Sequence, residues 1–227
     1  MQKRIVRKLD LEIVLSQIEP HPTPRPSLEQ YTIPTDIAAE MLYIAAYAND
    51  DIIGKKVLDL GCGTGRLALG AAFLGAKQAF GVDIDKTAVK SALKNSSKTG
   101  LRDKVQWIVA DLDAVRGDFD TVLQNPPYGV QTRGADRKFL EKALKTGKVV
   151  YSLHKGVDED EALLGRLKAA GGAIPVNPSL FLKRFIEQHG GRVKAVYAMV
   201  MTIPHVFSFH TKKRHEFVVD LYVLERD

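Results

Sequence analysis

Short apolar runs alternate with amphipathic segments along most of the chain. Four runs bounded by glycine, proline or charged residues predict strands at residues 57–60, 79–82, 105–109 and 119–123. Between them, residues 66–74 and 86–99 carry apolar positions at helical spacing and predict helices. Strands that alternate with helices are typical of a mostly parallel sheet covered by helices, so the pattern predicts an α/β fold.

The N-terminal part has a different character. An amphipathic helix is predicted over residues 3–18 by three apolar residues at helical spacing, Ile5, Leu9 and Ile13. Residues 20–26 are rich in proline and predict an extended, fairly stiff linker, because proline restricts both its own backbone and that of the residue before it. A second helix is expected over residues 36–48, with Thr35 as its N-cap.

The C-terminal half continues the same alternation. We expect a helix over residues 137–144, a strand over 149–153, a helix over 179–188, and strands over 193–201 and 216–224. Residues 157–178 are acidic first and then glycine-rich, and we expect a helix and a loop inserted at the surface.

Length and composition indicate how many domains the chain forms and what kind of partner its charge favours. With 227 residues and 45% apolar content, the chain suits one compact domain, so we expect an N-terminal helix and linker over residues 1–26 and a single domain over 27–227. No long uncharged apolar run occurs, which predicts a cytoplasmic protein without a membrane segment. The single cysteine excludes an internal disulfide. The formal charge of +6 favours a polyanionic partner without identifying it.

A glycine-rich loop, residues 61–65, follows the first predicted strand of the alternating block. Its sequence is Gly-Cys-Gly-Thr-Gly, and glycine lets a backbone approach a ligand closely. A dinucleotide-binding loop requires a third small residue where this chain has Arg66, so the pattern disfavours a nicotinamide cofactor.

Polar residues also end the next three strands. Asp83 follows the loop by about 20 residues, where an acidic side chain accepts from ribose hydroxyls, and Ile84 supplies an apolar face for a base. Asp111 lies just past the third strand, placed to accept from an adenine amine, and Asn125 ends the fourth strand. Because parallel strands end at one edge of a sheet, these residues and the glycine loop are expected on one rim.

The turn at residues 125–128, Asn-Pro-Pro-Tyr, can orient an amine for methyl transfer. An exocyclic amine on an aromatic base is a poor nucleophile, because its lone pair is delocalised into the ring. The Asn125 side-chain oxygen and the Pro126 carbonyl can each accept one of its N–H groups, and Pro126 and Pro127 stiffen the turn. Tyr128 offers a face on which a base can stack. Together with the rim, the turn predicts methyl transfer from a sulfonium cofactor.

Aromatic and cationic residues alternate between the last two predicted strands. They are suited to stacking bases and contacting phosphates, although a plain solvated hairpin is the alternative: Phe207, Phe209, His210, Lys212, Lys213 and Arg214. The histidines lack cysteine partners at metal-ligand spacing, so no metal site is expected.

These motifs resemble those of Rossmann-like class I, S-adenosylmethionine-dependent N6-adenine methyltransferases, on residues 57–65, Asp83 and 125–128. The closer resemblance is to the methyltransferase-like-five family of ribosomal RNA enzymes, carried also by residues 28–31, 150–155 and 209–213. It implies a seven-stranded, mostly parallel sheet whose last strand is antiparallel. It further implies N6-methylation of one adenosine in small-subunit ribosomal RNA.

The resemblance also assigns site residues. Catalysis would fall to Asn125, Pro126, Pro127 and Tyr128, and cofactor contacts to Gln30, Tyr31, Thr32, Asp59, Gly61, Cys62, Gly63, Gly65, Arg66, Leu67, Asp83, Ile84, Asp111, Leu112 and Asn125. It implies a small zinc-binding methyltransferase-activator protein, paired with an exposed edge strand at residues 105–109. Two departures are Ile33, where the family commonly has threonine, and the long segment 157–178.

Two other functions stay open from the sequence. Protein glutamine methylation also uses an Asn-Pro-Pro-Tyr turn, but such enzymes usually carry a helical substrate domain in front, and only about fifty residues precede the first strand here. A basic Rossmann module that binds RNA without catalysis is the other, and the intact glycine loop and Asn125 argue against it.

Overall fold

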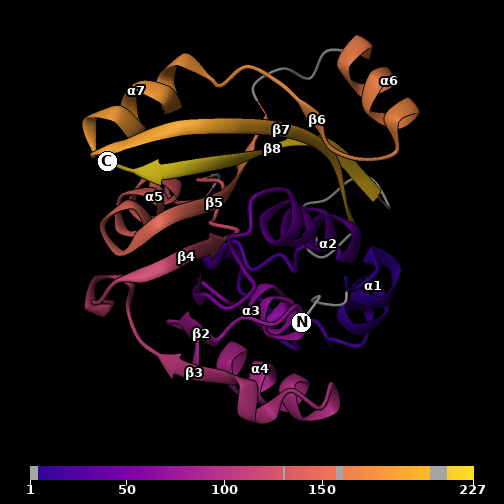
Figure 1. Ribbon diagram of the computed structural model, residues 1–227, viewed down its shortest axis with the longest axis vertical. Helices are drawn as coiled ribbons and strands as arrows, with labels where there is room; N and C mark the ends of the chain where they lie inside the picture. The colour runs from indigo at the N-terminus through magenta and orange to yellow at the C-terminus, as the bar shows by residue number, and fades with distance from the viewer. Residues whose placement is uncertain (1–4, 130, 157–160, 205–213) are drawn as a thin grey trace.

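The computed structural model describes residues 5–129, 131–156, 161–204 and 214–227. The strands of this part form one sheet in the order β3-β2-β1-β4-β5-β8-β7-β6 (Figure 1). Their bounds are β1 Lys56–Leu60, β2 Gln78–Asp83, β3 Val105–Val109, β4 Phe119–Gln124, β5 Gly147–Lys155, β6 Ile174–Pro175, β7 Gly191–Pro204 and β8 Arg214–Arg226. Strands β1 to β5 are mutually parallel, and β8 lies antiparallel between β5 and β7. The predicted α/β fold with an antiparallel last strand is confirmed.

The predicted number of strands was wrong. The described residues form eight strands instead of seven, because Ile174 and Pro175 pair antiparallel with Ala198 and Tyr197 in the middle of β7. The helix α6 (Glu161–Ala170) precedes this short strand, and its Leu167 is buried among residues of β7 and β8. The segment 157–178 therefore extends the sheet in addition to contributing a helix.

Helices cover both faces of the sheet. α1 (Lys8–Ser16), α2 (Thr35–Tyr43) and α3 (Arg66–Phe73) lie on one face, and α4 (Lys86–Lys98) packs against β2 and β3. α5 (Ala135–Thr146) and α7 (Leu180–Gln188) lie on the other face (Figure 1). Each face buries its own apolar cluster. Thr35 is the first residue of α2 and does not cap it; Pro34 holds the cap position.

The buried face of α1 differs from the predicted one. Ile5, Leu9 and Ile13 are 66%, 58% and 51% exposed, whereas Leu11 and Leu15 are fully buried in the cluster shared with α2 and α3. The sequence contains two apolar stripes at helical spacing, and contact with the rest of the fold selects the second. The helix also begins at Lys8, later than predicted.

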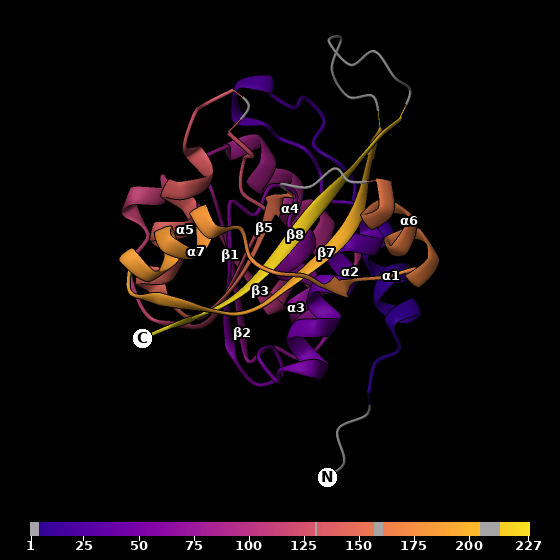
Figure 2. The ribbon, with the colours of Figure 1, turned by 90° about the horizontal axis from the view of Figure 1, so that it is seen from above.

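Strands β7 and β8 form a pair much longer than the central strands. They have 14 and 13 residues, whereas β1 has 5, and Figure 2 shows the pair running past the ends of the shorter strands. The predicted RNA-contacting residues Phe207, Phe209, His210, Lys212 and Lys213 lie outside the described residues, and Arg214 begins β8. None of the described helices is long and apolar enough to cross a membrane.

Candidate active site

A cavity of about 310 Å³ opens where the parallel strands end, and this volume suits a ligand of nucleoside size. The four rim positions predicted from the sequence, Gly61, Asp83, Asp111 and Asn125, all line it. The N-terminal segment 27–33 forms a further wall. The topology thus brings residues from five separate parts of the chain around one space.

The glycine loop is tied to the end of β2. Gly61 and Gly63 have φ values of 73° and 53°, and a Cβ on Gly61 would lie 2.7 Å from the ring of Phe139. The Gly63 N–H donates to Asp83 Oδ2 at 2.8 Å, and the Asp85 N–H donates to Asp83 Oδ1 at 2.8 Å. Burial raises the pKa of Asp83, and these backbone hydrogen bonds oppose the shift. Asp83 therefore fixes the loop and still faces the cavity.

Asp59 is the most deeply buried acid of the cavity wall. Its Oδ2 accepts the Ala68 N–H at 2.9 Å, at the start of α3. Burial raises its pKa to about 7, because removal from water disfavours the ionised form. A cationic ligand in the cavity would favour ionisation of Asp59.

Trp107 of β3 packs against the back of the glycine loop. A Cβ on Gly65 would lie 2.4 Å from its ring, and one on Gly81 would lie 2.3 Å away. Gly65 is the one residue among the predicted cofactor contacts that does not line the cavity, because that side of it faces Trp107. The edge strand thus supports the loop from behind.

The turn after β4, residues 125–128, lies between the cavity and the apolar core. Asn125 and Pro127 line the cavity, whereas Pro126 is buried and absent from the wall. The Tyr128 hydroxyl donates to Asn125 Oδ1 at 3.1 Å, and its ring packs edge-on against Phe217. Tyr128 is partly buried, and its ring packs against the core and does not line the cavity. Stacking of a base on Tyr128 stays a prediction.

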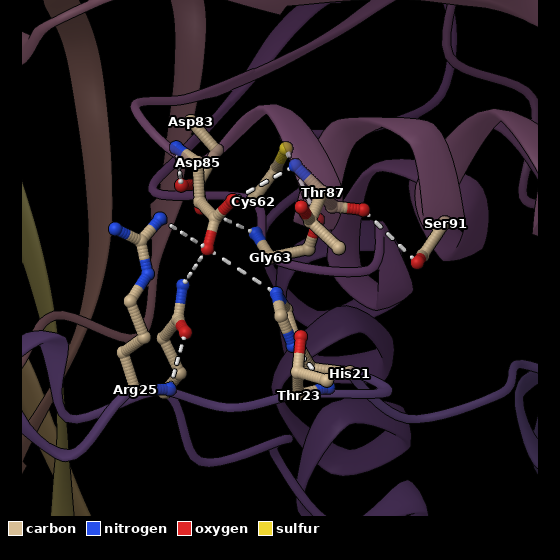
Figure 3. Close-up of polar contacts among 10 residues, drawn as sticks. His21, Thr23, Arg25, Cys62, Gly63, Asp83, Asp85, Thr87 and Ser91 are labelled. Atoms are coloured by element: carbon tan, nitrogen blue, oxygen red, sulfur yellow. Dashed lines mark hydrogen bonds and ion pairs between the residues drawn. The ribbon is translucent and has the colours of Figure 1, made fainter.

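The N-terminal segment is held by Asp85, the N-cap of α4, as Figure 3 shows for His21 and Arg25. Asp85 accepts from Arg25 at 2.7 Å and from the Gln30 amide at 2.8 Å, and His21 Nε2 lies 3.3 Å away. The carboxylate also caps α4 by accepting the Thr87 N–H. Burial alone would raise the pKa of Asp85, but the hydrogen bonds from Gln30 and Arg25 lower it well below its usual value. The amide N–H of Gln30 is thus engaged within the protein.

Arg66 fastens the same segment from the other side. Its guanidinium donates to the carbonyl oxygens of Ile33 and Ile18. Burial lowers its pKa to about 10. Arg66 lines the cavity, as do the remaining predicted cofactor contacts, Tyr31, Thr32, Cys62, Leu67, Ile84 and Leu112. Their contacts with a ligand stay a prediction.

Glu29 is a cavity residue to which the sequence analysis assigned no role, although it lies in the block 28–31 that carries the family resemblance. It is 8% exposed, and its Oε1 accepts the Gln131 N–H at 2.7 Å, just after the turn at residues 125–128. Its burial depends on a contact 102 positions away along the chain, so no local pattern distinguishes it from the other 26 acidic residues. In the part of the chain that the structure describes, no cluster of three or more metal-ligating side chains is present.

Comparisons with known proteins place this geometry in a family. Residues 40–126 match the model of ribosomal protein L11 methyltransferase (PrmA). The chain is 32% identical to the rRNA N(6)-adenosine-methyltransferase Mettl5 of Drosophila melanogaster, over 95% of this chain and 94% of the relative. It is also 32% identical to METTL5 of Danio rerio, over 93% of this chain and 95% of the relative.

A solved structure agrees with these relatives. A candidate RNA methyltransferase of Pyrococcus horikoshii superposes with a TM-score of 0.81 at 34% identity, over 98% of this chain and 99% of that one. The relatives thus span nearly the whole chain, including both the glycine loop and the turn at residues 125–128. The chain therefore belongs to the METTL5 family of rRNA N(6)-adenosine-methyltransferases.

Proposed function

We propose that this protein methylates N6 of one adenosine in small-subunit ribosomal RNA, with the target base flipped out of its stack. The family supports the coarser statement, an rRNA adenosine N6-methyltransferase that uses S-adenosylmethionine. The observation that carries the proposal is that Asn125 shares one cavity with Gly61 and Asp83. An amine held by Asn125 then lies beside a cofactor held by the loop and Asp83. A base in a helix cannot reach such a site, which is why it must be flipped.

The cavity wall fits S-adenosylmethionine. Four carboxylates line it, those of Glu29, Asp59, Asp83 and Asp111, and such a set suits a ligand with cationic groups, hydroxyls and an amine. Each Asp83 oxygen accepts one backbone N–H and can accept again from a ribose hydroxyl. Asp111 accepts the Asp113 N–H and can accept also from the adenine amine. Positive-φ glycines at the end of β1 leave room for the methionine portion.

The reaction needs little acid–base chemistry from the protein. S-adenosylmethionine supplies an electrophilic methyl group on its sulfonium. Asn125 Oδ1, which belongs to a residue of the cavity wall, would accept one N–H group of adenine N6. The Pro126 carbonyl is the acceptor that the sequence assigns to the other N–H, although Pro126 is buried and does not line the cavity. Two such acceptors would fix the amine and increase the negative charge on nitrogen. Tyr128 donates to the same Asn125 oxygen, so that the carboxamide presents its oxygen in a fixed orientation.

The edge strand β3 is where we expect a protein partner to bind. Among the described strands β3 pairs only with β2, and its Ile108 and Val109 are exposed. We propose that a small zinc-binding activator protein adds a strand at this edge. Co-purification should then be lost in Ile108→Glu, while Leu180→Glu, which makes the same change at an exposed apolar position of α7, serves as a charge-matched control. Equal recovery of the activator with both variants would exclude β3 as its binding site.

Transfer from labelled S-adenosylmethionine tests the function. The purified protein, with its partner present, is incubated with ribosomal RNA and with ribosomal proteins, and label is counted in each fraction. The proposal predicts label in RNA, and a decrease of at least about 100-fold in Asn125→Ala. Label in protein instead would favour glutamine methylation, the alternative that the Asn-Pro-Pro-Tyr turn at residues 125–128 leaves open. Cofactor binding without any transfer would favour the non-catalytic alternative.

A further inference from the structure

Glu29 is a buried residue of the cavity wall, and only one of its two carboxylate oxygens accepts a hydrogen bond from the described residues. Oε1 accepts the Gln131 N–H at 2.7 Å. Oε2 is also buried, and no described residue gives it a hydrogen bond. A buried carboxylate oxygen without a donor or cation is costly, so such an oxygen at a ligand cavity indicates that the ligand supplies the partner.

The backbone at Glu29 has an unusual conformation, and contacts on either side hold it in place. Glu29 adopts a left-handed conformation, φ 48° and ψ 44°, which residues other than glycine rarely adopt. The segment on either side is fixed, because Arg25 and Gln30 both bind Asp85. The fold therefore holds a charged side chain in a backbone conformation that glycine and asparagine adopt more readily.

The position of Glu29 within the cavity indicates which part of the ligand it meets. Gln131, which it contacts, follows the catalytic turn, so Glu29 lies at the Asn125 side of the cavity. Its negative charge contributes, after burial, to raising the pKa of both Tyr31 and Tyr128. The methyl to be transferred must be at this side, since the amine is held by Asn125.

The two basic side chains of the described cavity wall, His21 and Arg66, contact groups other than Glu29, although the buried Arg66 Nε has no hydrogen-bond partner among the described residues. Arg66 donates to the carbonyls of Ile18 and Ile33, and His21 lies against Asp85. Neither has a recorded ion pair or hydrogen bond with Glu29. The charge on Glu29 thus has no cationic neighbour on the described cavity wall to pair with.

We propose that Glu29 is a further cofactor-binding residue, whose Oε2 pairs with a positive charge of the methionine portion of S-adenosylmethionine. That portion carries two cationic groups, the sulfonium and the α-ammonium. The product, S-adenosylhomocysteine, keeps the ammonium and loses the sulfonium charge. The inference rests on the cofactor of the proposed function but not on its RNA substrate.

Calorimetry with three ligands tests the assignment. S-adenosylmethionine, S-adenosylhomocysteine and 5′-methylthioadenosine are titrated into the full chain, wild type and Glu29→Gln. The glutamine can still accept the Gln131 N–H, so the variant removes charge and little else. 5′-Methylthioadenosine is uncharged and lacks the amino-acid portion, and its affinity should not change. The affinity for S-adenosylmethionine should fall at least about 10-fold.

The second ligand separates the two cationic groups. A much smaller loss for S-adenosylhomocysteine assigns the sulfonium to Glu29, and an equal loss assigns the ammonium; both results support the proposal. Unchanged affinity for S-adenosylmethionine overturns it. So does an equal loss for all three ligands, which would mean that Glu29 only shapes the cavity.

Two further variants guard against damage to the fold. Glu40→Gln removes a charge that pairs with Lys8 outside the cavity and should leave all three affinities unchanged. Thermal unfolding without ligand reports whether Glu29→Gln is folded. If it is not, Glu29→Asp takes its place: it keeps the charge but shortens its reach, and the same selective loss for the charged ligands is expected.

Discussion

The hydroxyl of Tyr128 donates a hydrogen bond of 3.1 Å to the carboxamide oxygen of Asn125. The same hydroxyl lies 3.6 Å from the sulfur of Met201 in β7, and the ring packs edge-on against Phe217 in β8. Burial raises the pKa of Tyr128 well above its usual value, so the phenol stays protonated and remains a donor. The turn at residues 125–128 thus packs through Tyr128 against the long antiparallel pair β7 and β8.

Tyr128→Phe should slow methyl transfer moderately. The substitution keeps the ring and removes one hydrogen bond, worth about 0.5–1.5 kcal/mol, so kcat should fall roughly 2- to 10-fold. The KM for the cofactor should change little, because Tyr128 does not line the cavity. Steady-state kinetics on RNA measure both. A kcat equal to that of wild type would show that Asn125 does not need Tyr128 to be oriented.

Cofactor affinity should rise with pH through about 7. The pKa of Asp59 is raised to about 7 by burial, so the carboxyl is largely protonated below that pH. A cationic ligand favours the ionised form, and affinity should therefore fall by up to about tenfold for each pH unit below 7. Calorimetry between pH 5.5 and 8.5 measures this slope. Asp59→Asn should flatten it, and a slope that persists in that variant would assign it to another group.

Gly81→Ala should destabilise the fold and weaken cofactor binding. The added methyl would meet the Trp107 ring at 2.3 Å, and overpacking of this kind costs about 1–3 kcal/mol. Displaced, Trp107 would also press on Gly65 and the loop. The matched control is Gly165→Ala in α6, which has open space around it and should be neutral or slightly stabilising. Thermal unfolding measures the stability of the two variants, and cofactor titration measures their affinity. Equal unfolding midpoints for Gly81→Ala and Gly165→Ala would contradict the role given to Trp107.

His154 should make the fold less stable in acid. It lies in a buried chain of hydrogen bonds with Gln124 and Ser152, and burial lowers its pKa from 6.5 to about 4. Only the unfolded state then takes up a proton between these values, so the free energy of unfolding falls as the pH drops from about 6.5 to 4. The shift corresponds to roughly 3 kcal/mol at most.

Comparison with His154→Gln isolates this effect. Asp59, whose pKa is raised, changes stability in the opposite direction over the same range, so wild type alone would not show the contribution of His154. Denaturant unfolding at several pH values should give a wild-type-minus-variant difference that decreases below pH 6.5. A difference independent of pH would mean that His154 is protonated in the folded state as easily as in the unfolded one.

The local pattern of apolar runs and turn residues was enough to predict much of the fold. Residues 105–109 form a strand as predicted, and the first four strands end where their polar residues were expected. Each of those strands is an apolar run that ends at a turn, and parallel strands necessarily share an edge, so Asp83 and Asn125 could be placed on one rim from the sequence. Strand β6 was missed because its two residues, one of them proline, form a strand only by pairing with β7.

The remaining features depend on contacts between distant residues. The sequence offers two apolar stripes in α1, and only packing against α2 and α3 decides that Leu11 and Leu15 are buried. The orientation of Asn125 depends on Tyr128, whose ring in turn packs against Phe217, and the burial of Glu29 depends on Gln131. None of these relationships leaves a periodic pattern in the sequence.

Mapping of N6-methyladenosine in ribosomal RNA by mass spectrometry tests the central claim most directly. RNA is compared from cells with this protein, without it, and with Asn125→Ala in its place. The account predicts one adenosine of the small-subunit RNA that is methylated only when the wild-type protein is present. Methylation that persists without the protein, or that Asn125→Ala restores in full, would contradict it.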